Sequence, residues 1–152
     1  MADKLSVQFI YDFFYMLPVF HFAFNVTNLD EARDFYLRIL NCAEGRSAET
    51  WVDINFFGHQ LSLHLGQPFP SAYTGFVDGV AVPMPHFGAI LPMSTWEAVS
   101  TKLISRSVEF VIKPTERFTG KSGQQCTMFF LDPFGNPIEL KGVQNSNQIF
   151  KL

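Results

Sequence analysis

The hydrophobic pattern of the chain is organised around two short segments that each begin with a histidine. In residues 20–26, bulky apolar side chains occupy every second position and alternate with small or polar ones, the first of which is His21. A period of two is typical of a β-strand with one buried face. His86 likewise opens an apolar run at residues 86–91 that is short enough to be a strand.

A capped helical pattern follows each of these strands. Asn28 precedes Glu31 by three residues, and Ser94 precedes Glu97 by three. This is the spacing of a capping box, in which the first side chain accepts a hydrogen bond from the free N–H groups of the first helical turn. Apolar residues three and four positions apart then predict two amphipathic helices, the first of which ends near Asn41.

Three strand-like segments follow each helix. They lie at residues 44–49, 51–56 and 60–65 after the first helix, and at residues 108–112, 126–131 and 138–141 after the second. The chain therefore uses a β-α-β-β-β unit twice, at about residues 18–66 and 85–143. Residues 66–85 are rich in proline and glycine, so we expect a linker there rather than a further element. Its length indicates that it also borders a site.

Composition places both units in one domain. Of the 152 residues, 47% are hydrophobic and 16% are charged, and the net charge is −3. We expect a single domain at residues 18–143, with an N-terminal extension at 1–17 and a C-terminal tail at 144–152. The chain has no basic run, which excludes nucleic acid as a partner. Cys42 and Cys126 have no metal-binding or redox spacing, so we interpret them as small hydrophobes.

The apolar segments also limit where the protein resides. No segment reaches the roughly 20 apolar residues of a membrane-spanning helix. The N-terminal stretch is interrupted by Asp12 and Pro18 and lacks the uninterrupted apolar centre of a secretion signal. We therefore expect a cytoplasmic protein with no membrane partner. The apolar extension needs a surface to cover, which favours a homodimer.

Candidate chemistry is concentrated on three predicted strands. His21 and His86 open the first strand of each unit, and Glu139 lies between two aliphatic residues in the last strand. Our hypothesis is that these two imidazoles and one carboxylate, from three strands, form one shared site. His59 lies in a predicted turn, and we interpret it as a surface residue.

The closing segment links this pattern to a known family. Residues 131–140 read Leu-Asp-Pro-Phe-Gly-Asn-Pro-Ile-Glu-Leu. Together with paired β-α-β-β-β units and a first-strand histidine in each, this turn resembles the vicinal oxygen chelate superfamily, which includes glyoxalase, bleomycin-resistance proteins and extradiol dioxygenases. The resemblance implies an α+β fold in which two βαβββ modules form a half-open mixed β-barrel around a central divalent metal.

Within that superfamily the chain looks most like the extradiol dioxygenase branch. The resemblance then implies that His21, His86 and Glu139 are the metal ligands. It also implies that His64 is the catalytic acid/base, although the repeat leaves open whether Ser62 or His64 is the counterpart of Glu139.

Two further residues are candidate substrate contacts. Arg117 and Lys121 flank a glycine-rich loop, where they could clamp an anionic group, and we take Arg117 as the substrate-binding residue. Phe129 lines the pocket if its side chain points to the same side as Thr127.

Two histidines and one carboxylate are the ligand set of non-haem Fe(II) oxygenases, and they leave positions open on a six-coordinate metal.

The function expected is a metal-dependent dioxygenase, an oxidoreductase that acts on a small catechol-type or vicinal-oxygen substrate. Fe(II) is the expected metal, with Zn, Ni or Mn as alternatives. One alternative function is a non-redox isomerase or lyase of the glyoxalase type, and another is a metal-free binding protein like the bleomycin-resistance proteins. These alternatives stay open because the predicted strand 126–131 contains no tyrosine, which extradiol enzymes commonly place there.

Overall fold

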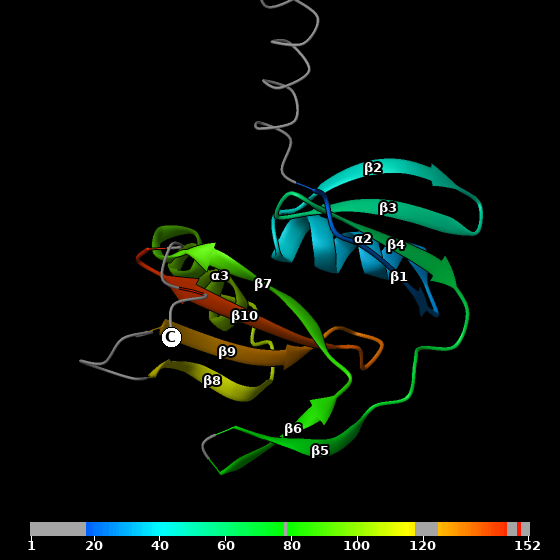
Figure 1. The fold of residues 1–152 in the computed structure, drawn as a ribbon. Helices are drawn as coiled ribbons and strands as arrows, with labels where there is room; N and C mark the ends of the chain where they lie inside the picture. Colours follow the sequence, from blue (N-terminus) through cyan, green and yellow to red (C-terminus); the bar gives the residue numbers. More distant parts are fainter. Residues whose placement is uncertain (1–17, 78, 118–124, 146–148, 150–152) are drawn as a thin grey trace, which may run out of the picture.

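The computed structural model, which describes residues 18–77, 79–117, 125–145 and 149, contains two four-stranded sheets (Figure 1). Across the first sheet the strands are β1 (His21–Val26), β4 (His59–Leu65), β3 (Trp51–Phe56) and β2 (Ala43–Ala48). Across the second they are β7 (Phe87–Pro92), β10 (Pro137–Val143), β9 (Gln125–Leu131) and β8 (Phe110–Arg117). The predicted N-terminal extension, the loop with Lys121 and most of the C-terminal tail lie outside the described residues.

Each sheet carries one helical segment between its first and second strands in the sequence. In the first module α2 (Leu29–Arg33) continues as a π-helical segment, η1 (Asp34–Ile39), and in the second module the helix is α3 (Met93–Ser105). The predicted α+β fold with two βαβββ modules is therefore confirmed. The two sheets do not close into the expected half-open barrel within this chain, because β1 and β7 are end strands of separate sheets among the described residues. No helix in the described part of the chain is long and apolar enough to span a membrane.

The two predicted helix starts had different outcomes. Asn28 caps α2 as expected, since its side chain accepts hydrogen bonds from the backbone N–H groups of Asp30 and Glu31. The prediction that Ser94 caps the second helix was wrong. The helix α3 begins at Met93, directly after the last residue of β7, and its N-cap position is Pro92 without a side-chain hydrogen bond. Because the strand leads straight into the helix, Ser94 already lies within the first turn.

The expected linker at residues 66–85 contains a β-hairpin, so that prediction was also wrong. Strands β5 (Ala72–Val77) and β6 (Val80–Met84) pair antiparallel across a tight turn at Gly79, whose φ of +79° suits glycine. The prolines and glycines of this segment are turn signals, and they hid two short strands that show no clear apolar alternation. The predicted strand at 108–112 is likewise longer, because β8 runs on to Arg117 through two register shifts. A proline is tolerated there because β8 is the outermost strand of its sheet.

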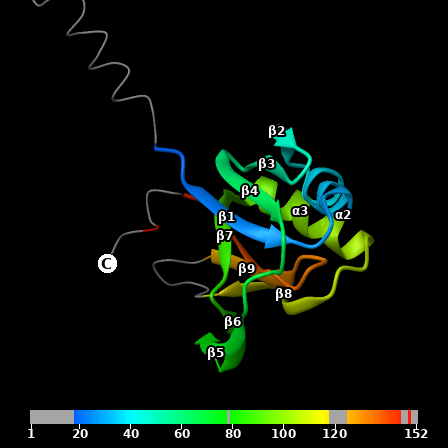
Figure 2. The same cartoon turned by 90° about the vertical axis from the view of Figure 1, so that its right-hand side faces the viewer.

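The two modules share one hydrophobic core on their helix sides. Figures 1 and 2 place α2 and α3 on the same side of the molecule. The core contains buried residues of both modules, and the rings of Phe35 and Phe130 approach to 6.3 Å between centroids across the junction. We call the face of each sheet that packs on this core the core face, and the opposite face the outer face.

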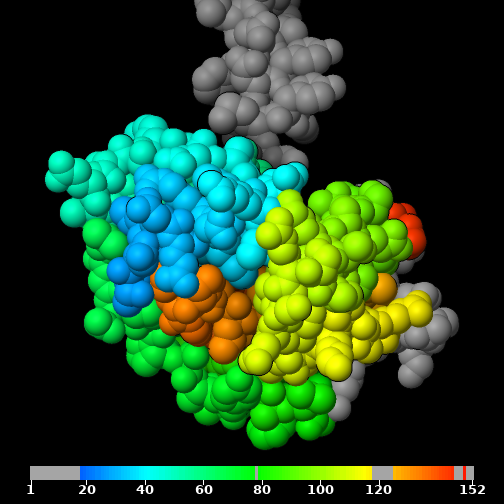
Figure 3. Space-filling view, turned by 180° about the vertical axis from the view of Figure 1, so that it is seen from behind, coloured from blue at the N-terminus to red at the C-terminus, as the bar shows by residue number. Residues whose placement is uncertain are grey.

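The closing turn of the second module ties the modules together. The Tyr36 hydroxyl donates a 2.9 Å hydrogen bond to Asp132 Oδ2, and both side chains are buried. The Asn136 side chain donates to Asp132 at 2.8 Å and reaches the backbone carbonyl of Asn25 in β1 at 3.4 Å. In Figure 3 this turn, coloured orange, lies against the blue part of the first module. The turn that carries the family resemblance in the sequence therefore positions one module on the other.

Removing the hydroxyl of this buried contact should destabilise the protein. Tyr36→Phe deletes a hydrogen bond to a buried carboxylate, which lowers the free energy of unfolding by about 2 kcal/mol. Urea denaturation followed by circular dichroism measures the change. The matched control is Tyr73→Phe, because Tyr73 is exposed on the hairpin and its substitution should leave stability unchanged. Equal stability of the two variants would contradict this account of the module junction.

Candidate functional site

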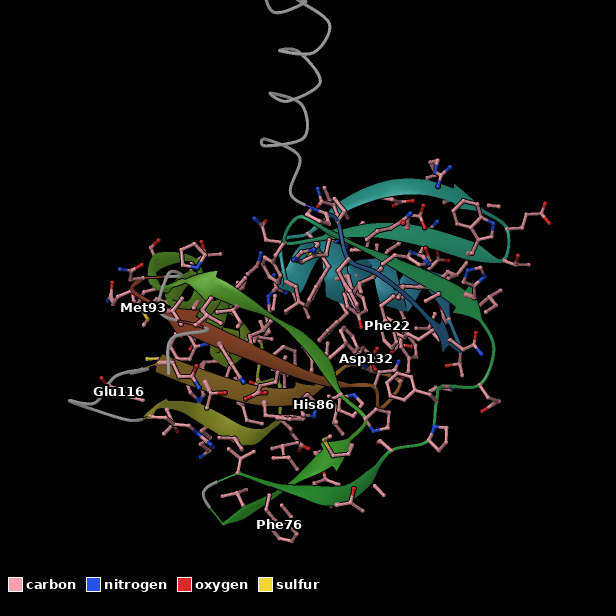
Figure 4. All side chains as sticks on the ribbon, viewed as in Figure 1. Phe22, Phe76, His86, Met93, Glu116 and Asp132 are labelled. Carbon is pink, nitrogen blue, oxygen red and sulfur yellow. The ribbon has the colours of Figure 1, made fainter. Side chains whose placement is uncertain are left out.

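His86 and Glu139 meet on the outer face of the second sheet. His86 immediately precedes β7, and Glu139 pairs in parallel register with Gly88 of the same strand. Paired residues of parallel strands project to the same face, and so do residues two positions apart in a strand. The side chains of His86 and Glu139 therefore point to the same side. The His86 Nε2 atom lies 3.4 Å from Glu139 Oε2. Figure 4 shows His86 where the chain passes from the β5–β6 hairpin into β7.

Neighbouring groups fix the orientation of both side chains. His86 Nδ1 lies 3.0 Å from the carbonyl oxygen of Pro83, and a carbonyl only accepts hydrogen bonds, so Nδ1 carries the proton in the neutral ring. The lone pair of His86 is then on Nε2, which faces Glu139. The Thr127 hydroxyl donates a hydrogen bond to Glu139 Oε1 at 2.8 Å. The rings of His86 and Phe129 pack edge to face.

The pair is accessible enough to bind a ligand. The side chains of His86 and Glu139 are 23% and 13% exposed, and a cavity of about 490 Å³ opens beside them. Lys141 also lines this cavity, and its ammonium group lies 3.6 Å from Glu139 Oε2. An imidazole nitrogen and a carboxylate oxygen that converge in an open cavity fit two positions of a divalent metal. A cationic group beside them fits an anionic substrate.

His59 is a residue of the candidate site that the sequence did not reveal. We expected it in a surface turn, but it opens β4 and is half-buried, and its Nδ1 accepts a hydrogen bond from the backbone N–H of Phe20. It lines the same cavity as His86. A single histidine at a strand end carries no local signal of this placement, because only the packing of one module on the other brings it there.

A second, larger cavity lies between the two edge strands β1 and β7. Its volume is about 680 Å³, its lining is mostly apolar, and His59, His64 and His86 are among its polar lining residues. The phenylalanines that line it are Phe20, Phe22, Phe24, Phe56, Phe69 and Phe87. An apolar cavity with a few polar groups is the usual form of a small-molecule site.

His21 lies on the outer face of the first sheet and is not gathered with His86 and Glu139. Its Nδ1 lies 2.9 Å from the Gln60 side-chain oxygen, and its ring is exposed. Within the described residues no three His, Cys, Asp or Glu side chains are close enough together to hold a metal ion. One chain therefore presents two separate parts of the expected ligand set.

The strand register identifies the first-module position that corresponds to Glu139. Ala23 pairs with Ser62 in the first sheet as Gly88 pairs with Glu139 in the second, so Ser62 is the counterpart of Glu139. His64 lies two residues further along β4, where its ring stacks on Trp51. His64 lies four residues beyond Gln60, the residue that pairs with His21, which places it roughly 13 Å further along the strand.

The two predicted substrate contacts are buried. Phe129 points to the outer face with Glu139 but is only 1% exposed, because Val82 of the hairpin and Ile112 cover it. Arg117 is buried at the end of β8, opposite Gln125. Neither residue lines the two cavities described above, so their roles in substrate binding stay predictions.

The two cysteines are free thiols. Burial raises the pKa of Cys42 to about 12, so this thiol is protonated at neutral pH and is a poor nucleophile. For Cys126 the main cause of a raised pKa is also burial, assisted by the nearby negative charges of Glu116 and Glu97. A structural interpretation of both residues agrees with these environments.

Comparison with known proteins gives a consistent result. The sequence profile of the Glyoxalase/Bleomycin resistance protein/Dioxygenase superfamily matches residues 19–140. A glyoxalase/bleomycin resistance protein/dioxygenase from Alicyclobacillus acidocaldarius is 28% identical over 88% of this chain and 96% of its own, with a TM-score of 0.69. No curated protein sequence was found to match.

Two more distant structures share the fold. The genomically encoded fosfomycin resistance protein FosX from Listeria monocytogenes is 15% identical over 89% of this chain and 99% of its own, with a TM-score of 0.60. A glyoxalase/dioxygenase from Nostoc punctiforme is 19% identical over 84% of this chain and 92% of its own, also with a TM-score of 0.60.

The close approach of β7 to β10 makes Gly88 essential for the geometry of the pair. A Cβ atom at this position would lie 1.6 Å from the backbone oxygen of Glu139. We therefore expect Gly88→Ala to push the two strands apart and to lower the free energy of unfolding by about 3 kcal/mol or more, measured by urea denaturation. In the control Gly58→Ala the new Cβ meets nothing within 4 Å, so only the positive φ of +93° opposes it, at roughly 1 kcal/mol. A Gly88→Ala variant as stable as this control would contradict the prediction.

Proposed function

Because the chain belongs to the Glyoxalase/Bleomycin resistance protein/Dioxygenase superfamily, we propose that it is a metal-dependent enzyme whose sites are shared between two copies of the chain. The observation that carries the proposal is the His86–Glu139 pair, with its nitrogen and oxygen ligand atoms 3.4 Å apart beside an open cavity. In each site His86 and Glu139 of one copy hold the metal together with His21 of the other.

The exposed edges of the two sheets support this assembly. The strands β1 and β7 each pair on one side only among the described residues, and the histidines lie at their starts. Val19, Phe20 and Ile90 are large apolar residues at these edges that are 61%, 60% and 42% exposed. Two copies that place β1 of one beside β7 of the other would cover these side chains and would bring His21 to His86.

The reaction proposed is oxygen insertion into a small aromatic substrate that carries adjacent oxygens, as in extradiol dioxygenases. Two histidines and one carboxylate are the ligands of non-haem Fe(II) oxygenases, and the metal, when bound, would supply the centre for substrate and dioxygen. The chain itself holds Glu139 through Thr127 and presents the Lys141 ammonium to an anionic oxygen. The phenylalanine-lined cavity next to His86 would take the aromatic ring, and His64, which lines it, would move protons.

A second candidate is a non-redox isomerase or lyase that uses the metal only as a Lewis acid. Next to Glu139, strand β9 presents Thr127 and Phe129 on the outer face and no tyrosine hydroxyl to bind a ring oxygen. The Lys141 ammonium instead favours a substrate with a fully anionic group.

Metal content and oxygen uptake test the proposed function. We expect elemental analysis of anaerobically prepared protein to find about one iron per chain, and Glu139→Ala to remove it, because the carboxylate is the only anionic ligand of the three. The matched control Glu97→Ala changes an exposed glutamate on α3 and should keep the iron. The iron-loaded protein should consume oxygen with a catechol substrate in an oxygen electrode.

Each other result has a defined meaning. Turnover of a substrate without oxygen uptake would replace the dioxygenase by the isomerase or lyase. Protein that binds no metal under any loading condition would overturn the proposal and leave a metal-free binding protein.

A mixed dimer tests whether the site is shared. We expect His21→Ala and Glu139→Ala homodimers each to bind no metal. A heterodimer of the two variants, isolated with two different affinity tags, should bind one metal per dimer. One of its two sites combines the intact His21 of one copy with the intact His86 and Glu139 of the other, whereas the second site carries both substitutions. A heterodimer without metal, alongside a wild-type dimer that binds it, would place all three ligands in one chain instead.

A further inference from the structure

A buried carboxylate on the first sheet is connected to His21 through one glutamine. Asp53 of β3 is 6% exposed and lies opposite Ser62 on the outer face. Its Oδ2 atom accepts a 3.0 Å hydrogen bond from Gln60 Nε2, and its Oδ1 accepts one from the Ser62 hydroxyl. Gln60 in turn lies opposite His21 in the parallel register of β1 and β4, with its Oε1 atom 2.9 Å from His21 Nδ1.

The ionisation of Asp53 determines how this glutamine is oriented. Burial works against ionisation, but the hydrogen bonds from Ser62 and Gln60 and the positive charge of Arg46 outweigh it and hold the pKa of Asp53 below its usual value. An ionised carboxylate only accepts hydrogen bonds. The NH₂ group of Gln60 must therefore face Asp53, and its carbonyl oxygen must face His21.

The orientation of Gln60 then determines where His21 carries its proton. An amide oxygen only accepts hydrogen bonds, so the nitrogen next to it, Nδ1, must be the protonated one in the neutral imidazole. The lone pair of the ring is left on Nε2. His86 is held in the same tautomer, but there the acceptor is the backbone carbonyl of Pro83 rather than a side chain.

We propose that Gln60 and Asp53 are positioning residues that hold His21 as the Nδ1–H tautomer, with Nε2 free to bind the metal. The metal-binding part of this inference rests on the proposed function, whereas the tautomer is a property of the metal-free protein. A second hydrogen-bonding partner that fixes the ring and its tautomer typically changes metal affinity 10–100-fold when it is removed. Asp53 acts only through Gln60, and it is the negative charge that gives the amide a single orientation.

Nitrogen-15 NMR of the metal-free, histidine-labelled protein tests the tautomer directly. At a pH where the imidazoles are neutral, the protonated and unprotonated ring nitrogens have well-separated chemical shifts, and His21→Ala identifies the His21 signals. We expect Nδ1 of His21 to be the protonated nitrogen in the wild-type protein. In Gln60→Leu the His21 signals should shift toward the Nε2–H tautomer. In Asp53→Asn, which keeps the side-chain volume, they should shift part of the way, because the amide of Gln60 can then turn over.

The controls separate this effect from misfolding and from a failure of the proposed function. The His86 signals should be unchanged in both variants, since Pro83 holds that ring, and they report that the fold is intact. Gln67→Leu, an exposed glutamine outside this network, should leave His21 unchanged. Unchanged His21 tautomer populations in Gln60→Leu, or a wild-type His21 protonated on Nε2, would overturn the inference. The expected shifts in a protein that binds no metal would support the positioning role while the proposed function fails.

Discussion

The packing of the two modules through their helix sides is the constraint on which the rest of the structure depends. Tyr36 and Asp132 form a buried hydrogen bond at this junction, and Asn136 extends it to the backbone of β1. With the core faces packed on one shared interior, the outer faces and the cavity between the edges of β1 and β7 are the surfaces left for chemistry. The polar side chains of each sheet are accordingly found there, with His21, Gln60 and Asp53 on one and His86, Thr127 and Glu139 on the other.

This packing explains why one chain presents its candidate ligands in two parts. The outer faces belong to separate sheets, so His86 and Glu139 converge while His21 stays apart. If a second copy completes each site, then the module packing that stabilises one chain also makes the pairing of two copies a requirement for activity. The exposed apolar residues at the free edges of β1 and β7 are consistent with such a surface.

The two copies of the repeated unit differ at the position of the candidate carboxylate ligand. The equivalent positions of the two sheets hold Ser62 and Glu139, so a carboxylate at this position is present only in the second module. In the first module a carboxylate is found one strand away, as Asp53, where it orients Gln60 instead of facing a ligand directly. In the second module the β5–β6 hairpin supplies the carbonyl of Pro83 and covers Phe129, so an element outside both modules shapes the site.

The sequence by itself predicted most of the secondary structure of the two modules and named His21, His86 and Glu139 as candidate ligands. Alternating apolar positions predicted the strands, the Asn28 cap predicted the first helix, and the turn at residues 132–136 pointed to the superfamily, because each of these signals is local along the chain. Ser94 failed as a cap because β7 runs directly into α3. The hairpin in residues 66–85 was missed because β5 and β6 lack an alternating pattern and contain or adjoin glycines and prolines. The placement of His59 beside His86, the separation of His21 from Glu139 and the connection of His21 to Asp53 were decided by the tertiary structure alone. Each depends on strand register and on the packing of one module against the other, and these relations join residues far apart in the chain that no local pattern connects.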